Sequence, residues 1–225
     1  MPKLPKSKPS KEILMTAMQI YETLSDSYDN PRWWSDDPYQ IMVQAVLVQN
    51  TAWTSVEKVT QAVKNNLTPE RISALSSERL EALIRPCGFS KAKAATIQRL
   101  TAWYGRYQYN AESVEKIPKD DLRTELLGIK GIGAETADVL LVYAFHKASF
   151  IIDAYTRRFL KRLGYPFKND MQIRTFFEQE LPADYRIYGW YHWLILDHGI
   201  KKCKKTPVCD SCCFTNCAFL HNRYS

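Results

Sequence analysis

The chain has 225 residues, of which 45% are apolar and 24% charged, so it is long enough for one large or two small domains and wholesale disorder is excluded. Lysine and arginine outnumber acidic residues by 31 to 24, and the resulting charge of +7 suits either a polyanion partner such as nucleic acid or simple solubility. The longest apolar runs, such as residues 139–145, fall far short of the ~20 residues that span a bilayer, and no apolar segment follows the basic N-terminus. We therefore expect a cytoplasmic protein with no membrane partner.

The hydrophobic spacing predicts helices along nearly the whole chain. After a Lys/Pro/Ser-rich arm at residues 1–10, apolar residues at Leu14, Met18 and Tyr21 follow helical spacing and predict a first helix. The later helices are predicted, in chain order, at 39–48, 56–63, two short ones within 75–84, then 94–104, 118–127, 134–145, 154–163, 173–181 and 185–196. Sustained alternation of the kind that strands show is absent from the sequence, so we expect an all-α fold of about ten helices.

A glycine-rich turn at residues 128–133, Gly-Ile-Lys-Gly-Ile-Gly, separates two of these helices. Glycine permits positive φ and the close approach of another backbone. The amides of residues 132–134 are expected to be unpaired at the start of the next helix, where they and the helix dipole favour an anion such as phosphate. An ordinary tight corner is the alternative, but three glycines in a basic chain favour phosphate binding. Ile129 and Ile132 are expected to anchor the turn in the core.

Four segments together resemble the endonuclease III superfamily of DNA glycosylases. Residues 128–136 are similar to the family's helix-hairpin-helix, and 150–158, Phe-Ile-Ile-Asp-Ala-Tyr-Thr-Arg-Arg, to the segment that carries its catalytic aspartate. Residues 45–51, Ala-Val-Leu-Val-Gln-Asn-Thr, resemble the segment whose glutamine enters the DNA stack, and 198–203 the approach to its cysteine loop. The resemblance covers roughly residues 30–217. Within the superfamily, the endonuclease III-type 3-methyladenine glycosylases look closest.

The resemblance implies two helical lobes with a DNA-binding cleft between them. Residues 36–147 would form a six-helix barrel that ends in the helix-hairpin-helix. The other lobe would be discontinuous: an N-terminal arm and helix at 1–35, together with 148–225, which carry the catalytic aspartate and a metal cluster. The expected partner is double-stranded DNA with a damaged base, bound by a monomer that associates with the nucleoid through its DNA.

Asp153 is the catalytic carboxylate that the resemblance implies. Such a carboxylate can stabilise positive charge at C1′ of the sugar and orient or deprotonate a water. The plainer alternative is an N-cap for the helix that begins at residue 154. Bifunctional members carry a Schiff-base lysine where this sequence has Glu135. A carboxylate cannot form an imine, so we expect a glycosylase without lyase activity, with Lys130 or Lys147 as minority replacements.

The residues expected to contact DNA come from the glutamine segment, the hairpin and the approach to the cysteine loop. They are Gln49, Asn50, Lys130, Gly131, Ile132, Gly133, Lys201 and Lys202. Trp33 and Trp34 are candidates for the base pocket, although core packing is the commoner fate of tryptophan. A cationic alkylated purine such as 3-methyladenine would gain about 0.5–2 kcal/mol from stacking on tryptophan, which makes alkylated purines the leading substrate class.

Five of the six cysteines fall within the last part of the chain, at 203, 209, 212, 213 and 217, and this clustering indicates a metal or iron–sulfur site rather than a disulfide framework. The resemblance implies a [4Fe-4S] cluster on Cys203, Cys209, Cys212 and Cys217. Cys213 is the alternative to Cys212 as a ligand. Zinc held by four cysteines is the alternative cofactor.

Two other functions stay open at this point. One is a bifunctional, endonuclease III-like glycosylase and AP lyase for oxidised pyrimidines, against which Glu135 argues. The other is a protein that binds DNA lesions without chemistry, against which the presence of Asp153 at the catalytic position argues.

Overall fold

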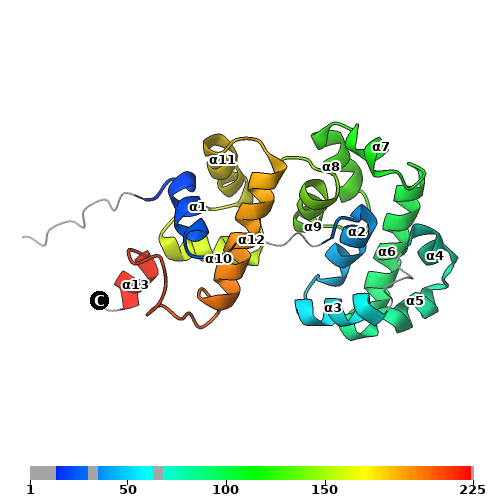
Figure 1. The fold of residues 1–225 in the computed structure, drawn as a ribbon, viewed down its shortest axis with the longest axis horizontal. Helices are drawn as coiled ribbons and strands as arrows, with labels where there is room; N and C mark the ends of the chain where they lie inside the picture. The colour runs from blue at the N-terminus through cyan, green and yellow to red at the C-terminus, as the bar shows by residue number, and fades with distance from the viewer. Residues whose placement is uncertain (1–13, 30–34, 63–67, 224–225) are drawn as a thin grey trace, which may run out of the picture. The chain divides into compact units, whose positions relative to one another are not determined.

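The computed structural model describes residues 14–29, 35–62 and 68–223, and all regular structure in these residues is helical (Figure 1). The prediction of an all-α fold is confirmed. The elements are α1 Ala17–Ser25, α2 Pro38–Leu47, α3 Trp53–Ala62, α4 Pro69–Ala74, α5 Ser77–Ile84, the 3₁₀ turn η1 Arg85–Cys87, α6 Ser90–Gly105, α7 Ala111–Glu115, α8 Lys119–Leu127, α9 Ala134–Val139, the π-helical segment η2 Leu140–Ala144, α10 Ala154–Leu163, α11 Asp170–Glu180, α12 Tyr185–Lys201 and α13 Ala218–Arg223.

These helices belong to two compact units. Unit 1 consists of Met1–Asp29, Ala154–Leu181 and Leu194–Ser225, and unit 2 of Asn30–Asp153 and Pro182–Trp193. Residues 30–35, 148–153 and 182–193, expected in the lobe of the cysteine loop, fall within unit 2 in this division, and the last two segments pack together there. The physical reason is aromatic packing: the fully buried Phe150 meets the ring edges of Tyr188 and Tyr191 at centroid distances of 5.7 and 5.5 Å.

Unit 2 has its core around α2 and α6. Pro38 occupies the first turn of α2, and the Asp37 carboxylate caps the helix by accepting from the Tyr39 amide at 2.8 Å. Every residue of α2 from Tyr39 to Leu47 except Gln40 is buried. The hydroxyls of Tyr39 and Thr101, on α6, are 2.6 Å apart, so the two central helices are joined by a buried hydrogen bond as well as by apolar packing.

Unit 1 begins with α1, where the predicted apolar stripe is wrong. Thr16 and Gln19 form a capping box, so the helix begins at Ala17 and buries Ala17, Ile20 and Leu24. Leu14 and Met18, which the spacing placed on the buried face, are both exposed. Ala17, Ile20 and Leu24 form a second apolar series at helical spacing, and this series is the one that packs into the core.

The predicted helix at 134–145 is present, but only its first part is α-helical. It starts as α9 and continues from Leu140 as a π-helical segment, in which the Phe145 amide donates to Leu140 O at 3.1 Å, five residues back. Such segments are rare and occur often at functional sites. The helix predicted at 154–163 coincides with α10, whose buried residues are Thr156, Phe159, Leu160 and Leu163.

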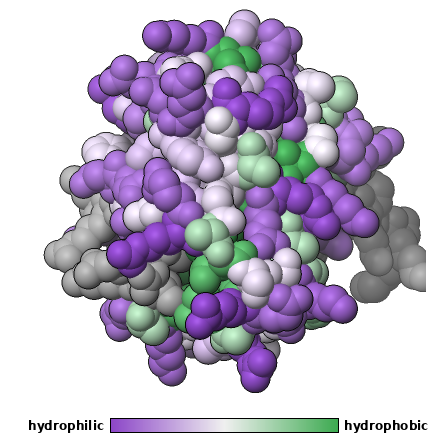
Figure 2. All heavy atoms as spheres, turned by 90° about the vertical axis from the view of Figure 1, so that its right-hand side faces the viewer, coloured by the Kyte–Doolittle hydropathy of each residue, from purple (hydrophilic) through white to green (hydrophobic). Residues whose placement is uncertain are grey.

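The side of unit 2 that carries α4 and α5 is predominantly hydrophilic, and its apolar residues form small, separate islands (Figure 2). Across the described ranges, the structure has no helix that is long and apolar enough to cross a membrane.

Candidate active site and cysteine loop

The glycine-rich turn joins α8 to α9 in unit 2, as a tight hairpin. Gly131 has φ +104°, and a Cβ atom at this position would lie 2.0 Å from Thr96 Oγ1, so only glycine fits there. Ile129 and Ile132 are buried, which confirms that they anchor the turn. Lys130 and Gly131 are exposed between these anchors, and Gly133 is exposed directly after them. The hairpin therefore presents backbone and one lysine to solvent while its apolar side chains hold it in place.

The anion site predicted at this turn is smaller than expected. The Ile132 amide donates to Ile129 O at 2.9 Å, because the tight turn closes on itself, so this amide is not available to an anion. The amides of Gly133 and Ala134, where α9 begins, remain candidates for phosphate contact. Behind the turn, Arg99 Nη1 donates to Lys130 O at 3.1 Å and holds the backbone from the side of α6.

Gln49 and Asn50 lie in the turn that follows α2. The Gln49 side chain reaches the hairpin, where Nε2 donates to Thr136 Oγ1 at 2.9 Å and to Gly131 O at 3.2 Å. Asn50 is exposed and has a left-handed backbone with φ +52°. The structure thus brings the predicted glutamine segment against the predicted phosphate-binding turn, within one unit.

Asp153 lies at the end of a buried segment, directly before α10. Asp153 is only 6% exposed. Its Oδ2 is 3.7 Å from Nε2 of His192 on α12, which is equally buried. His192 Nδ1 is 3.0 Å from the Tyr143 hydroxyl, which donates to Gly189 O at 2.9 Å. Tyr143 is carried by η2. Tyr143 therefore joins the π-helical segment to α12 by hydrogen bonds, next to the predicted catalytic carboxylate of Asp153.

The hydrogen-bond geometry fixes the role of His192. Tyr143 has one hydroxyl hydrogen, and the carbonyl of Gly189 can only accept it. His192 Nδ1 must then donate to the Tyr143 oxygen, so Nε2 faces Asp153 either with a proton or with its lone pair. Burial, and then the Asp153 carboxylate, raise the pKa of Tyr143 far above its usual range, so this phenol stays protonated. The arrangement fixes the His192 ring with Nε2 3.7 Å from the Asp153 carboxylate.

Glu135 and Asp138 follow the hairpin on α9 and have different surroundings. Glu135 is exposed in the first turn of the helix, where a carboxylate is favourable to the helix dipole. Asp138 is buried, accepts from Arg123 Nε at 2.9 Å and accepts from Ser149 Oγ at 2.9 Å. Asp138 therefore forms a structural ion pair with Arg123, and Glu135 is the acidic residue of α9 that is exposed to solvent.

The cysteine loop, residues 202–217, joins α12 to α13 in unit 1 and contains no helix. Four of its thiols line one small cavity together with aromatic and aliphatic side chains: Cys203, Cys209, Cys212 and Cys217, with Phe159, Leu163, His198 and Phe214 among their neighbours. Cys213 is not part of this lining. His198, Cys212 and Cys213 also place their ligand atoms within 4.8 Å of one another, a competing three-donor group.

Two cationic or polar groups approach the thiols of this cavity. Arg162 Nη1 lies 3.1 Å from Cys203 Sγ, and His198 Nε2 lies 4.0 Å from Cys212 Sγ. Burial alone raises the pKa of the Cys203 thiol, but hydrogen bonds from His198 and Arg162 outweigh it and bring the pKa below its usual range. Four soft sulfur donors around one cavity, with positive charge beside them, fit an iron–sulfur cluster or zinc.

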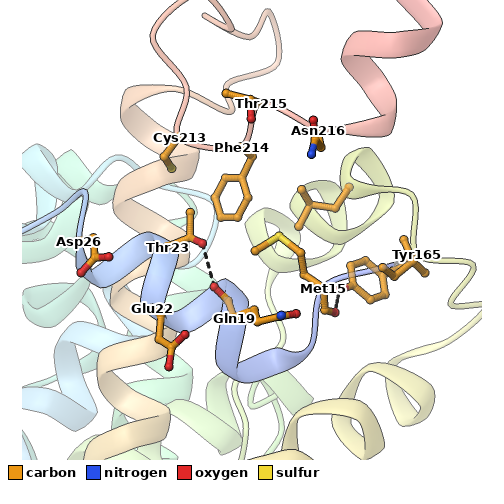
Figure 3. A pocket seen from close by; sticks show the side chains of 12 residues that line it. Met15, Gln19, Glu22, Thr23, Asp26, Tyr165, Cys213, Phe214, Thr215 and Asn216 are labelled. Carbon is orange, nitrogen blue, oxygen red and sulfur yellow. Dashed lines mark hydrogen bonds between the residues drawn. The ribbon is translucent and has the colours of Figure 1, made fainter. Parts of the chain in front are cut away.

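A larger pocket of about 730 Å³ lies on the other side of the loop, where Cys213, Phe214, Thr215 and Asn216 face α1 (Figure 3). The α1 side chains that line it, Gln19, Glu22 and Thr23, are polar or acidic, and Asp26 joins them from the C-cap of the helix. Cys213 lines this pocket, whereas Cys203, Cys209 and Cys217 line only the small cavity. The adjacent Cys212 and Cys213 therefore line different pockets, although their sulfur atoms lie within 4.8 Å of each other.

The remaining predicted residues are partly placed. Lys201 ends α12 and pairs with Asp197 at 2.8 Å, and the next residue, Lys202, donates to Ser211 Oγ at 2.5 Å. Trp33 and Trp34 lie outside the described residues. One residue that the sequence did not single out is Phe89, which is 72% exposed and has φ +48°. The only signal for it in the sequence is the Gly-Phe-Ser segment itself, which does not reveal exposure.

A family model described as "HhH-GPD superfamily base excision DNA repair protein" matches residues 43–183. The chain belongs to the HhH-GPD superfamily. A Methanocaldococcus jannaschii protein with the provisional name DNA repair glycosylase is 40% identical over 202 residues, which cover 86% of this chain and 91% of that protein. The match to the superfamily includes Gln49, the hairpin and Asp153, and it ends before the cysteine loop. The expected family is thereby confirmed, and with it membership among DNA glycosylases.

Two solved structures of this superfamily have a similar fold. A trapped covalent intermediate of endonuclease III with DNA has a TM-score of 0.78 and 25% identity, and covers 94% of this chain and 100% of that one. The 3-methyladenine DNA glycosylase of H. pylori, bound to 1,N6-ethenoadenine, has a TM-score of 0.73 and 24% identity, and covers 83% and 98%. Both likenesses extend over most of the chain, so the HhH-GPD fold is not confined to the hairpin.

Proposed function

We propose that this HhH-GPD protein is a monofunctional DNA glycosylase. It binds double-stranded DNA, turns a damaged base out of the helix and hydrolyses the bond between that base and its sugar, with Asp153 as the catalytic residue. The single observation that carries the proposal is a buried carboxylate, Asp153, in the same unit as a glycine hairpin suited to phosphate and next to the hydrogen-bonded pair His192–Tyr143.

DNA binding is supported by charge and by similarity. The chain carries a net charge of +7, and an endonuclease III structure with the same fold contains DNA. We assign phosphate contact to the hairpin, through Lys130 and the amides of Gly133 and Ala134, and to the lysines at 201 and 202. Gln49 and Asn50 are the residues we assign to the space that the everted base leaves. Phe89, an exposed aromatic ring on a left-handed backbone, belongs to the same class of DNA-facing group.

The chemistry follows from the position of Asp153. As the bond from the base to C1′ breaks, positive charge grows on the sugar, and the Asp153 carboxylate stabilises it. A water oxygen then bonds to C1′ and its proton passes to Asp153. His192 Nε2 lies 3.7 Å from this carboxylate, and Tyr143 fixes the orientation of the imidazole. A cationic alkylated purine leaves as a neutral base, so the reaction needs no separate acid.

The absence of a suitable lysine supports the monofunctional assignment. Glu135 stands at the family's Schiff-base position and cannot form an imine. Of the two replacements considered, Lys147 donates its Nζ hydrogen to Glu115 O, and Lys130 is an exposed side chain on the hairpin.

Alkylated purines are the proposed substrate class. Support comes from the fold shared with the H. pylori 3-methyladenine glycosylase and from Trp33 and Trp34 in the sequence, whose flat rings suit a cationic base. We propose that a [4Fe-4S] cluster binds Cys203, Cys209, Cys212 and Cys217, because these four thiols share one cavity and Cys213 does not. A bound cluster would cross-link the cysteine loop and thereby hold in place the segment that carries Lys201 and Lys202.

Base release from duplexes with one defined lesion tests the function. Separate duplexes carry 3-methyladenine, 1,N6-ethenoadenine, thymine glycol or uracil, and strand breaks are scored with and without alkali. We expect breaks only after alkali, with the alkylated purines cut fastest. Breaks without alkali, together with covalent trapping by borohydride, would support the AP lyase alternative instead. Tight binding without release of any base would support the non-catalytic alternative.

A further inference from the structure

Lys93 is a buried lysine that the site described above does not use. It lies in the second turn of α6 and is only 3% exposed. Its Nζ donates to three oxygens: Leu47 O at 2.7 Å, Thr51 Oγ1 at 2.7 Å and Cys87 O at 2.8 Å. An ammonium group has three hydrogens, so these three acceptors use all of them.

The surroundings of Lys93 stabilise its charge without an acid. Leu47 O is the last carbonyl of α2, and Cys87 O is the last carbonyl of η1, so two helix ends direct their negative poles at the ammonium. In the described parts of the chain, no carboxylate lies within 4.0 Å of Nζ. Burial lowers the pKa of Lys93, and the three short hydrogen bonds favour the charged form. The ammonium form of a lysine has no lone pair with which to attack a sugar. Because the three hydrogen bonds favour this form, we do not regard Lys93 as a replacement for the missing Schiff-base lysine.

The three acceptors of Lys93 belong to two turns that are far apart in sequence. Leu47 and Thr51 flank Gln49 and Asn50, and Cys87 stands two residues before the exposed Phe89. Thr51 Oγ1 also donates within this cluster, to Gln49 O at 3.2 Å or to Cys87 O. Within the Gln49 turn, one backbone hydrogen bond is long, from the Gln49 amide to Val46 O at 3.4 Å, and one has ordinary length, from the Thr51 amide to Val48 O at 3.1 Å. The conformation of the turn, including the left-handed backbone of Asn50, is therefore held by the hydrogen bonds of Lys93 to Leu47 and Thr51 and by those of Gln49 to the hairpin.

We propose that Lys93 is a positioning residue that fixes the Gln49–Asn50 turn, and with it the Phe89 turn, in the conformation that enters DNA when a base is turned out. The inference rests on the proposed function, because it assumes that this turn faces DNA. It assigns to Lys93 no contact with DNA and no part in bond cleavage. A loss of its ammonium group should therefore impair insertion into DNA while leaving Asp153 and general DNA affinity in place.

The test compares Lys93→Met with Lys91→Met. Both remove one lysine charge from the start of α6, but Lys91 is exposed and so serves as the matched control. The probe is a duplex with a tetrahydrofuran abasic analogue and 2-aminopurine in the opposite strand, whose fluorescence rises when a side chain unstacks it. We expect Lys91→Met to keep the fluorescence rise and Lys93→Met to lose most of it, with base release in single turnover slowed by about 10- to 100-fold.

A double-mutant cycle with Gln49→Ala separates this inference from the proposed function. If Lys93 acts through the turn, Lys93→Met has no further effect on fluorescence in the Gln49→Ala background. A wild-type fluorescence rise in Lys93→Met, or fully additive effects in the double variant, would overturn the role of Lys93. If Gln49→Ala and Asp153→Asn both leave base release unchanged, the proposed function fails first.

Thr51→Val provides a second route if Lys93→Met does not fold, as judged by circular dichroism. Thr51 is half-buried and supplies the side-chain acceptor of the cluster, so its loss should weaken the same fluorescence signal by a smaller factor. A Thr51→Val protein that folds and gives the full wild-type signal would contradict the inference in the same way.

Discussion

Asp153 is held by packed side chains of unit 2, whereas the four cysteines of the small cavity in unit 1 lie in a loop that has no helix between Lys201 and Ala218. Around Asp153, the partners are protein groups: His192, Tyr143 and the carbonyl of Gly189. Around the cysteines, two described contacts come from Arg162 and His198, and the sulfur atoms face a common space. The surroundings of Asp153 are thus made of packed protein groups, whereas the cysteine loop places four cysteines around one small cavity. The two should respond to different perturbations.

Asp153→Asn is the change with the largest expected effect. The amide is nearly isosteric but cannot neutralise charge on the sugar, so we expect single-turnover base release to fall by about 100- to 10,000-fold. Asp138→Asn is the matched control, because Asp138 is equally buried but pairs with Arg123. It should lower the free energy of unfolding by about 1–3 kcal/mol and leave the rate of the folded protein near that of wild type. Equal losses of rate in both variants would show that the effect of Asp153 is structural.

Cys203→Ala and Cys213→Ala compare a thiol of the small cavity with the neighbouring thiol of the larger pocket. We expect Cys203→Ala to lose the bound metal and much of the DNA affinity, and Cys213→Ala to keep both. Iron, sulfide and zinc analysis of the purified protein, together with visible absorbance, measures the outcome. Loss of metal in Cys213→Ala but not in Cys212→Ala would reverse the ligand assignment. Stoichiometric zinc without sulfide would replace the cluster by the zinc alternative.

Gly131→Ala is expected to affect unit 2 alone. The new Cβ would lie 2.0 Å from Thr96 Oγ1 and would be forced into a backbone with φ +104°, so we expect a loss of about 1–3 kcal/mol in the free energy of unfolding. Urea denaturation measures this loss. Gly133→Ala is the control, because a Cβ there meets no atom within 4 Å and φ is −94°. An equally large loss in Gly133→Ala would mean that the hairpin tolerates no side chain at all, whatever the contact with Thr96.

Glu125→Gln has the smallest expected effect and gives a pH dependence. Hydrogen bonds from Tyr107 and, in smaller measure, Trp103, with the nearby Arg106 charge, hold the pKa of Glu125 below its usual range despite partial burial. A lowered pKa in the folded state stabilises the protein above the usual glutamate pKa, and this contribution is lost as the pH falls through the lower value. We expect Glu125→Gln to cost less than about 1 kcal/mol at neutral pH and nothing in strong acid. A constant difference across the pH range would contradict this origin.

The sequence predicted the helices that have one clear apolar face and little competition at their ends. The prediction at 154–163 coincides with α10, because its four buried residues recur at helical spacing. It gave the wrong buried face at α1, because two apolar series at helical spacing overlap there and only that of Ala17, Ile20 and Leu24 packs into the core. The π-helical geometry of η2 leaves no periodic signal in five residues, so the position of Tyr143 could not be foreseen.

The candidate site was predictable only where a resemblance carried it. Asp153 and Gln49 came from segments similar to the family, and the family itself is confirmed. The partnership of Asp153 with His192 joins residues 39 positions apart, and only the folded chain brings them together. Lys93 illustrates the same limit, because a lysine in an amphipathic helix is normally exposed. Its burial depends on carbonyl groups at the ends of two other helices, which no local pattern describes.

The π-helical segment Leu140–Ala144 also has a consequence for how this chain tolerates insertions and deletions. A turn that closes over five residues holds one residue more than an α-turn needs, as the bond from the Phe145 amide to Leu140 O shows. A chain shorter by one residue here could form a regular helix with better-aligned hydrogen bonds. Each residue of an α-helix advances by about 100°, so the same deletion would rotate Tyr143 or the segment after it away from Gly189 and His192. The shorter chain would gain helical regularity and lose the register on which the catalytic region depends.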